Sequence, residues 1–342
     1  MDHDSGRVLA ELNADQRVEP ASITKVMTVY VAFDALKQKR ARLDSEVPIS
    51  EKAWRQGIDS SESRMFLDVG KTAKLEDLLR GIIIQSGNDA AVVVAEFLGG
   101  TEEGFAQIMN HYAATLGLKN THYADASGMP NPEHYTTARD IATLSRALIR
   151  NFPELYRIFA EREFTYHGIR QYNRNGLLGR DPSVDGIKTG HTNSAGYCLA
   201  ASARRDKMRL ISVVMGAPSI RAREAANAAL LSHGFTFYET AKVTSPKLSP
   251  RVYKSEDETA AVGVPRDIYV TVPRGEASGL KVATKLHEPL IAPLLANKPV
   301  GEMTVSTAGG EVVAHSPLMP LKAVPEGGWL AGMVDSVALW FK

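Results

Sequence analysis

The chain has 342 residues, of which 44% are apolar and 23% are charged, the usual balance of a globular protein. This length is enough for two domains, each with a hydrophobic core. The formal net charge of +1 excludes the broad basic surface typical of nucleic-acid-binding proteins, so no nucleic-acid partner is predicted. Cys198 is the single cysteine, so no intramolecular disulfide can form, and its apolar neighbours predict a buried strand residue.

No signal peptide is predicted from the first residues, because the first four have neither a basic start nor an apolar stretch. Residues 7–12 are predicted to form a strand, and residues 13–15 a turn. Pro20 then introduces a helix over residues 21–39, since proline suits the first turn of a helix and apolar residues recur at helical spacing.

The middle of the chain alternates apolar and polar residues with a helical period, and its later part changes to short strands. Helices are predicted at 75–84, 90–97, 101–116 and 137–149. Strands are predicted at 163–166, 187–189, 196–203 and 208–215, followed by a helix at 220–238. A sheet built from both chain ends, with an all-helical insert between them, predicts an α+β fold for residues 1–239.

Residues 240–326 differ in pattern. Proline, glycine and short alternating β segments dominate, which predicts a small all-β sandwich as a second domain. Residues 327–342 follow as a separate amphipathic segment.

A hydroxyl and an amine stand three residues apart in Ser22-Ile23-Thr24-Lys25. Residues at this spacing share a helix face, so Lys25 can reach Ser22. Serine needs a base to become a nucleophile, and a neutral lysine can serve. Alone this pattern is weak, because it arises by chance in a chain of this length.

Two further elements make the pattern specific. Ser86-Gly87-Asn88 interrupts two helices, as residues that face a cleft would. Lys188-Thr189-Gly190 ends a predicted edge strand, where glycine lets another backbone approach closely. The order Ser-x-x-Lys, Ser-x-Asn, Lys-Thr-Gly is the combined signature of penicillin-binding proteins and serine β-lactamases.

The chain as a whole resembles the low-molecular-mass penicillin-binding proteins that act as serine D-alanyl-D-alanine carboxypeptidases (peptidase family S11). The resemblance extends beyond the three motifs to Asn173-Arg174-Asn175-Gly176-Leu177-Leu178 and Arg221-Ala222-Arg223-Glu224, and covers essentially the whole chain. It implies a β-lactamase/transpeptidase-like domain with an antiparallel sheet and a helical insert, followed by the all-β domain. Peptidoglycan stem peptides ending in D-Ala-D-Ala are the implied substrate, and β-lactams the implied acylating inhibitors.

The resemblance also implies a role for each catalytic residue. Ser22 would attack the carbonyl between the last two D-alanines, and Lys25 would accept its proton. Backbone N–H groups of Ser22 and His191 would form the oxyanion hole. Ser86 would relay a proton to the leaving D-alanine.

The implied substrate-binding residues hold the peptide and its terminal carboxylate. Asn88 would hold the peptide backbone, and Lys188 would supply positive charge. Thr189 would bind the carboxylate together with a cation, for which Arg174 is the first candidate because guanidinium matches carboxylate geometry. Arg223 is a second candidate, with a surface helix arginine as the alternative. Neither a metal site nor a cofactor is predicted.

Two other functions are compatible with parts of the pattern. A β-lactamase would need a water-activating base, and Glu133 is the one obvious acid in the corresponding loop, although its setting does not match the known motif. A non-catalytic cell-wall-binding protein would not need all of the motif residues.

The C-terminal segment predicts an interfacial membrane helix. Its apolar residues fall on one broad helical stripe: Trp329, Leu330, Met333, Val334, Val337, Trp340 and Phe341. The segment is too short to span a bilayer but suits a helix lying on a membrane, with docking on its own domain as the alternative. Together with the resemblance, this places the protein in the periplasm of a bacterium, at the outer face of the inner (cytoplasmic) membrane.

Overall fold

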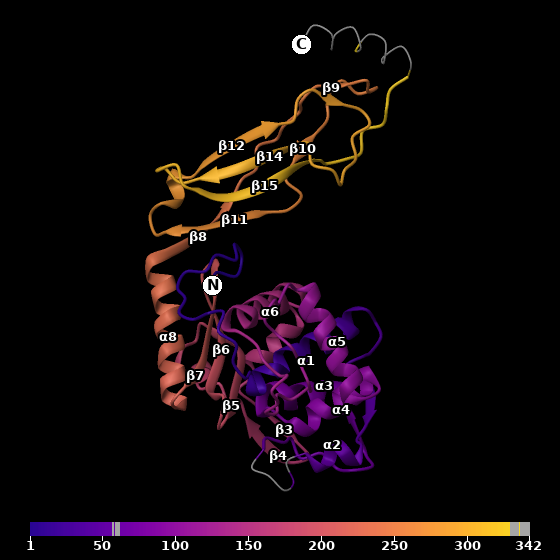
Figure 1. Cartoon of the computed structure of the whole chain (residues 1–342), viewed down its shortest axis with the longest axis vertical. Coiled ribbons are helices and arrows are strands. Elements are labelled where there is room, and N and C mark those ends of the chain that lie inside the picture. Colours follow the sequence, from indigo (N-terminus) through magenta and orange to yellow (C-terminus); the bar gives the residue numbers. More distant parts are fainter. Residues whose placement is uncertain (57, 59–61, 329–334, 336–342) are drawn as a thin grey trace. The chain divides into compact units, whose positions relative to one another are not determined.

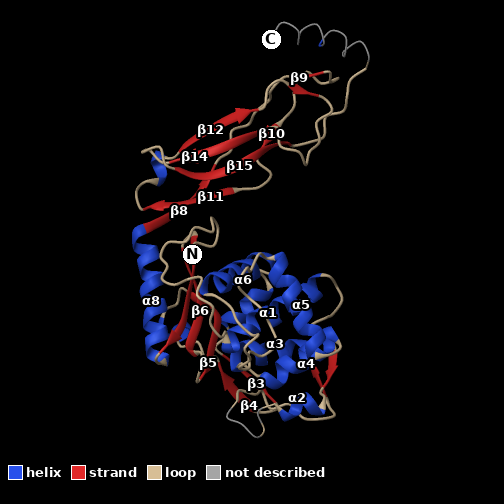
Figure 2. Ribbon diagram, viewed as in Figure 1, coloured by secondary structure: helices blue, strands red, loops and turns tan. Residues whose placement is uncertain are grey.

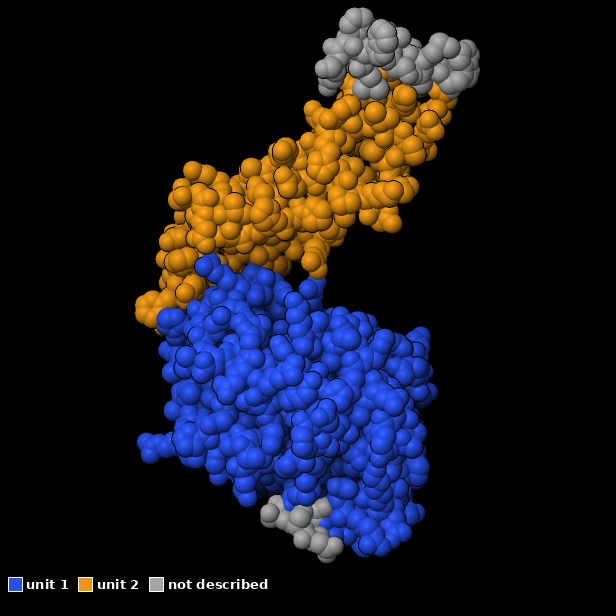
Figure 3. All heavy atoms as spheres, viewed as in Figure 1, with its two compact units in different colours: residues 1–235 blue, residues 236–342 orange. Residues whose placement is uncertain are grey.

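The computed structural model of the protein describes residues 1–56, 58, 62–328 and 335. The chain divides into two compact units, Met1–Phe235 and Thr236–Lys342, drawn in different colours in Figure 3. Each unit has its own cluster of buried apolar side chains. The helices and sheets of the first unit confirm the predicted α+β class. The regular elements described in the second unit after α8 (Ile220–Phe237) are strands, apart from one 3-10 turn.

The first unit is built on an antiparallel sheet of three strands in the order β5-β6-β7. These strands are β5 (Val184–Thr192), β6 (Gly196–Arg205) and β7 (Met208–Ala217). Helix α8 (Ile220–Phe237) lies along one face of the sheet, and the other helices gather on the opposite face (Figures 1 and 2). Strand β5 is at the edge of the sheet, as the sequence predicted, and Cys198 is buried in β6.

The predicted helices are confirmed, with small shifts at their ends. Residues 21–39 form a short 3-10 helix, η1 (Ala21–Thr24), that leads directly into α1 (Lys25–Lys37). The remaining helices of this layer are α2 (Glu51–Arg55), α3 (Leu75–Arg80) with the π-helical turn η2 (Gly81–Gln85), α4 (Asn88–Gly99), α5 (Glu102–Thr115), α6 (Ala138–Asn151), the 3-10 helix η3 (Leu155–Ala160) and α7 (Leu177–Arg180). None of the helices in the described ranges has both the length and the apolar character needed to cross a bilayer.

Two short pairs of antiparallel strands complete the first unit. Strand β1 (Glu46–Pro48) pairs with β2 (Thr72–Lys74), and β3 (Glu163–Tyr166) pairs with β4 (Ile169–Tyr172). Of these strands, the sequence predicted only β3. Strands β1 and β2 are three residues each and lie about 25 positions apart in the chain, so local periodicity carries no signal for them.

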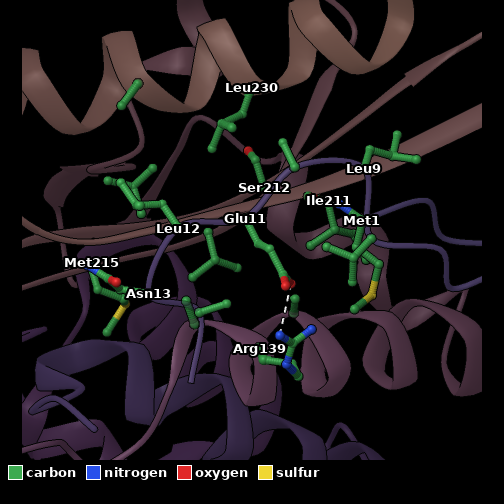
Figure 4. A pocket seen from close by; sticks show the side chains of 18 of the residues that line it. Met1, Leu9, Glu11, Leu12, Asn13, Arg139, Ile211, Ser212, Met215 and Leu230 are labelled. Carbon is green, nitrogen blue, oxygen red and sulfur yellow. Dashed lines mark hydrogen bonds and ion pairs between the residues drawn. The ribbon is translucent and has the colours of Figure 1, made fainter. Parts of the chain in front are cut away.

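The predicted strand at residues 7–12 is wrong, and with it the idea that the N-terminal end forms a full strand of the sheet. The N-terminal segment contributes only an isolated bridge, Asp2 to Leu210. Beyond it, residues 8–14 line an apolar cavity of about 780 Å³ instead of pairing with β7. Figure 4 shows this cavity between β7, α8 and α6, with Glu11 in an ion pair with Arg139 at 2.8 Å.

The second unit consists of short sheets. Four strands form a sheet in the order β10-β15-β14-β12, and two pairs, β8 with β11 and β9 with β13, accompany it. Their bounds are β8 (Tyr238–Val243), β9 (Val252–Tyr253), β10 (Val262–Gly263), β11 (Ile268–Pro273), β12 (Lys281–Leu286), β13 (Leu290–Ile291), β14 (Gly301–Ser306) and β15 (Val312–Pro320), with a 3-10 turn η4 (Ala277–Gly279). All the residues of the predicted apolar stripe at 329–341 lie outside the described residues.

Candidate active site

The candidate nucleophile lies in the short helical turn before α1. Ser22 belongs to η1 and is partly exposed, whereas its neighbours Ala21, Ile23 and Thr24 are buried. The N-terminus of α1 follows without a break, so Lys25 begins the helix one turn after Ser22. The predicted proximity is confirmed, because Lys25 Nζ lies 2.8 Å from Ser22 Oγ.

The Lys25 side chain is fully buried and has three polar contacts. Besides Ser22 Oγ, its Nζ donates to Asn88 Oδ1 at 2.7 Å and to the main-chain carbonyl of Ser127 at 2.8 Å. Burial lowers the pKa of Lys25 to about 7, with the negative charge of Asp125 opposing the shift. Near neutral pH, a substantial fraction of the amine is therefore uncharged.

These contacts also fix where the electron pair of the neutral amine points. A neutral amine has two N–H groups and one electron pair. The oxygens of Asn88 and Ser127 that face Lys25 can only accept, so they take the two N–H groups. The remaining electron pair then faces the Ser22 hydroxyl, which is the arrangement that a general base requires.

The second motif, Ser86-Gly87-Asn88, lies where η2 ends and α4 begins, which confirms its predicted position at a turn between helices. Ser86 is buried and has a left-handed backbone with φ of 68°. Asn88 begins α4, and its Nδ2 donates to Glu62 Oε2 at 2.8 Å. Because the Glu62 carboxylate can only accept, it takes the NH2 group of Asn88 and leaves the amide oxygen facing Lys25.

The third motif lies on edge strand β5. A Cβ atom on Gly190 would approach Pro20 O to 3.0 Å and Ile23 N to 3.1 Å, which confirms the predicted close approach of a second backbone. This contact brings the edge of β5 against the turn that carries Ser22. Lys188 is buried there, and burial and then the charge of Lys25 lower its pKa well below the usual value. Thr189 is also buried.

Two predicted substrate-binding residues are exposed. Arg174 follows β4, and its charge lowers the pKa of both Lys25 and Lys188, so it lies within electrostatic range of both amines. His191 is in β5 beside the Lys-Thr-Gly motif, where its ring stacks on Tyr197 with 4.0 Å between ring centroids. An exposed guanidinium near the two lysines is available to a ligand anion.

Arg223 differs from Arg174. It is buried in α8, so the alternative of a surface helix arginine is wrong. Its Nη1 donates to the main-chain carbonyls of Gly190 at 3.2 Å and Cys198 at 3.3 Å. These bonds tie α8 to β5 and β6, and they make Arg174 the better placed cation for a substrate carboxylate.

Sequence reasoning missed the carboxylates that support the site. Asp89 is buried and accepts N–H groups of Met65, Phe66 and Leu67 at 2.9, 3.1 and 3.3 Å, which holds that segment against the start of α4. Glu62, in contact with Asn88, was also missed. Glu133, which the β-lactamase hypothesis would use, is exposed.

Sequence reasoning also missed an acid and a histidine near the Ser127 carbonyl that contacts Lys25. Asp125 Oδ2 and His134 Nδ1 lie 3.3 Å apart. The run Asp125-Ala126-Ser127-Gly128 carries a usable signal, because aspartate two or three residues before glycine predicts a side-chain-capped turn. Nothing in the sequence connects that turn to Lys25, which is about 100 residues away.

Two family profiles match the chain. One, described as D-alanyl-D-alanine carboxypeptidase, covers residues 1–219. The other, described as the C-terminal domain of penicillin-binding protein 5, covers residues 238–326. The two matches fall on the two units of the structure in chain order.

Similar proteins of known name support the same family. The chain is 43% identical to D-alanyl-D-alanine carboxypeptidase DacA of Escherichia coli, over 100% of this chain and 86% of that protein. It is 42% identical to DacC of the same organism, over 100% and 87%. Among solved structures, penicillin binding protein 5 from Haemophilus influenzae has a TM-score of 0.89 and 41% identity, covering 95% of this chain and 96% of that one.

Proposed function

This chain belongs to the D-alanyl-D-alanine carboxypeptidase family of serine peptidases, and from that premise we propose how its residues divide the reaction. The protein is a serine hydrolase that removes the terminal D-alanine of peptidoglycan stem peptides through an acyl-enzyme, and it is acylated by β-lactams. The observation that carries the residue assignment is the set of three contacts around Lys25 Nζ.

Acylation begins with Lys25 in its neutral form. Its electron pair takes the Ser22 hydroxyl proton while Ser22 Oγ bonds to the carbonyl carbon of the scissile peptide. The negative charge that develops on the carbonyl oxygen is stabilised by the backbone N–H groups of Ser22 and His191. The C–N bond then breaks, and the departing D-alanine nitrogen receives the proton held by Lys25 through Ser86, which returns Lys25 to its neutral form.

Deacylation completes the cycle. Water adds to the ester carbonyl and loses its proton to the neutral amine of Lys25. The bond to Ser22 Oγ then breaks, and the proton returns to Ser22. Burial lowers the pKa of Lys25 to about 7, so the same amine can accept and return the proton in both halves of the reaction.

Recognition of the terminal carboxylate rests on groups around β5. Thr189 supplies a hydroxyl, and Arg174 supplies a guanidinium that can bind a carboxylate through two parallel bonds. The charge of Lys188 adds to the positive potential, and Asn88 positions the peptide backbone. The contacts of Arg223 with main-chain carbonyls support a role in holding the sheet, so Arg223 is the second candidate for the carboxylate.

A direct test uses a peptide ending in D-Ala-D-Ala and measures released D-alanine. Release, together with a penicilloyl-enzyme that survives isolation, supports the proposal. Rapid turnover of nitrocefin without a stable penicilloyl-enzyme would instead support the β-lactamase hypothesis. Absence of both acylation and D-alanine release would leave a non-catalytic cell-wall-binding protein.

We also propose that the protein works in the periplasm and rests on the outer face of the inner membrane through residues 327–342. The support is the apolar stripe in the sequence and the location of the substrate outside that membrane. Asp335, the one described residue of the stripe region, accepts from Lys254 N at 2.6 Å and Arg251 Nη2 at 3.1 Å, which favours the alternative of a docked segment at that point.

Vesicles distinguish the two arrangements. Full-length protein and a variant lacking residues 328–342 are mixed with anionic liposomes and sedimented. A membrane helix predicts that only the full-length protein sediments, while both release D-alanine from a soluble peptide at equal rates. Equal behaviour of the two in the pellet would mean that the segment is docked on its own unit.

A further inference from the structure

One of the three groups that hold Lys25 is a main-chain carbonyl in an irregular loop. Ser127, which provides it, lies between α5 and α6 in a segment with neither helix nor strand. Because a flexible loop could not hold a buried amine in one orientation, something else must fix the Ser127 carbonyl.

The side chain of Asp125 fixes the loop from within. Its Oδ1 accepts from Ser127 N at 2.7 Å, Gly128 N at 2.6 Å and Ser127 Oγ at 3.1 Å. Its Oδ2 accepts from Met129 N at 3.2 Å. Burial alone would raise the pKa of Asp125, but the hydrogen bonds from His134 and these N–H groups outweigh it and hold the pKa below the usual value.

The loop is also pressed against the turn that carries the nucleophile. Gly128 has a φ of +91°, and a Cβ atom there would lie 1.8 Å from the carbonyl oxygen of Ala21. No larger residue fits at this position, so the loop and the turn before Ser22 are in direct backbone contact.

His134 connects this loop to the last residue of η1, the turn that also carries Ser22. Its ring is almost completely buried, with Nδ1 3.3 Å from Asp125 Oδ2 and Nε2 2.9 Å from Thr24 Oγ1. Thr24 is fully buried and directly precedes Lys25. The contacts therefore close a ring: Lys25, the Ser127 carbonyl, Asp125, His134, Thr24 and back to Lys25 through the chain.

We propose that Asp125 and His134 are positioning residues for acylation, which hold the Ser127 carbonyl against Lys25 and thereby direct the electron pair of the amine toward Ser22. Neither residue touches the substrate in this mechanism. The proposal rests on the proposed role of Lys25 as the base, and it adds a histidine and an aspartate outside the three motifs.

The charge of Asp125 provides a readout that packing alone would not give. The charged side chains that act on Lys25 from the surrounding elements are Asp125, Asp89 and Glu62, which raise its pKa, and Arg174, which lowers it, while Lys188 and Lys25 repel each other. Asp125 is the strongest of the charges that oppose the effect of burial. Removing it lowers the pKa of Lys25, so the amine stays neutral to a lower pH.

The experiment measures the rate of acylation by fluorescent penicillin from pH 5 to 9 in the full-length protein. Thr24→Val and Asp125→Asn keep the side-chain volume, and His134→Gln breaks the ring at its centre. All three are expected to lower the plateau rate by up to about 100-fold. In Asp125→Asn alone, the acid limb of the profile should also move to lower pH.

His122→Gln is the matched control, because this histidine lies beside the same loop and contacts the carbonyl of Glu133 instead of Asp125. It should label like the wild type. Thermal melting identifies any variant that does not fold, and if His134→Gln is one of them, the two isosteric variants decide.

Wild-type rates and an unmoved acid limb in the folded variants would overturn the proposal, as would a uniform loss in Asp125→Asn with no shift of the limb. D-alanine release by the wild type tests the proposed function separately. Evidence against the positioning role of Asp125 and His134 would therefore not count against the carboxypeptidase activity.

Discussion

The two units bury different kinds of side chain. The first unit buries two lysines of the candidate site, Lys25 and Lys188, together with Arg223 and acids such as Asp89 and Glu224. Among the described residues of the second unit, the buried polar side chains are Ser255, Thr271, Thr307 and Asp335, and of these only Asp335 is charged. Its partner is Arg251, at 3.1 Å.

This difference indicates that the first unit carries the chemistry, whereas the buried side chains of the second unit serve its stability. Burying a charge costs free energy, so a fold keeps buried lysines only where another requirement favours them. In the first unit, the requirement that we propose is a lysine with a lowered pKa, as a general base needs. The second unit meets no such requirement, and its core consists of valine, leucine and similar apolar residues.

The largest effect is expected at the base. Lys25→Arg preserves the charge but removes the ability to lose a proton, so acylation should fall by about 100- to 10,000-fold. The rate of covalent labelling by fluorescent penicillin measures it. If the neutral amine is the active form, as proposed, then kcat/KM of the wild type should decline as the pH falls through the Lys25 pKa of about 7.

Lys71→Arg is the matched control, since Lys71 is exposed and paired with Asp68 at 3.0 Å. It should label at the wild-type rate. If Lys25→Arg labels equally fast, Lys25 is not the base, and its burial needs another explanation.

A smaller effect is expected in substrate recognition. Arg174→Ala and Thr189→Val should each lower kcat/KM for a D-Ala-D-Ala peptide by about 10- to 100-fold, because each removes a hydrogen bond to a carboxylate. Against the same peptide with an amidated end, neither variant should lose much further activity. Initial rates of D-alanine or D-alaninamide release measure both.

Arg170→Ala, on strand β4, is the control for loss of a nearby arginine, because Arg170 is exposed and paired with Glu163 at 2.6 Å. Should the two site variants discriminate acid from amide as the wild type does, the carboxylate is held elsewhere, and Arg223 is the next residue to change.

The smallest effect on activity is expected from the second unit. Met303→Ala, in the centre of β14, should lower the free energy of unfolding of that unit by about 2–5 kcal/mol and leave turnover of a soluble peptide unchanged. Differential scanning calorimetry and D-alanine release measure the two quantities, with the exposed neighbour Glu302→Ala as control. A parallel loss of turnover would show that the second unit supports the chemistry.

Short-range patterns predicted most of the first unit. The helices and the buried strands of the sheet follow from apolar periods of three to four and of two residues, and Lys25 reaches Ser22 because the two are one helical turn apart. Gly190 was expected to allow a close backbone approach, and the contact with Pro20 and Ile23 confirms it.

Features that depend on distant parts of the chain were missed. The ring of Asp125, His134 and Thr24 joins segments about 100 residues apart, and the contact of Glu62 with Asn88 spans 26 positions. Residues 7–12 contain a short apolar run, as a strand often does, but a strand also needs a partner, and this segment does not pair with β7. A single sequence indicates the local propensity of a segment to form a strand, but it does not show which distant segment pairs with it.

The most direct test of the whole account is the site of acylation. The full-length protein is incubated with penicillin, digested and analysed by mass spectrometry beside Ser22→Ala. One penicilloyl group is expected, on the peptide that contains Ser22, and Ser22→Ala should show neither labelling nor D-alanine release. Covalent labelling of that variant at the wild-type level, or an adduct on another residue, would contradict it.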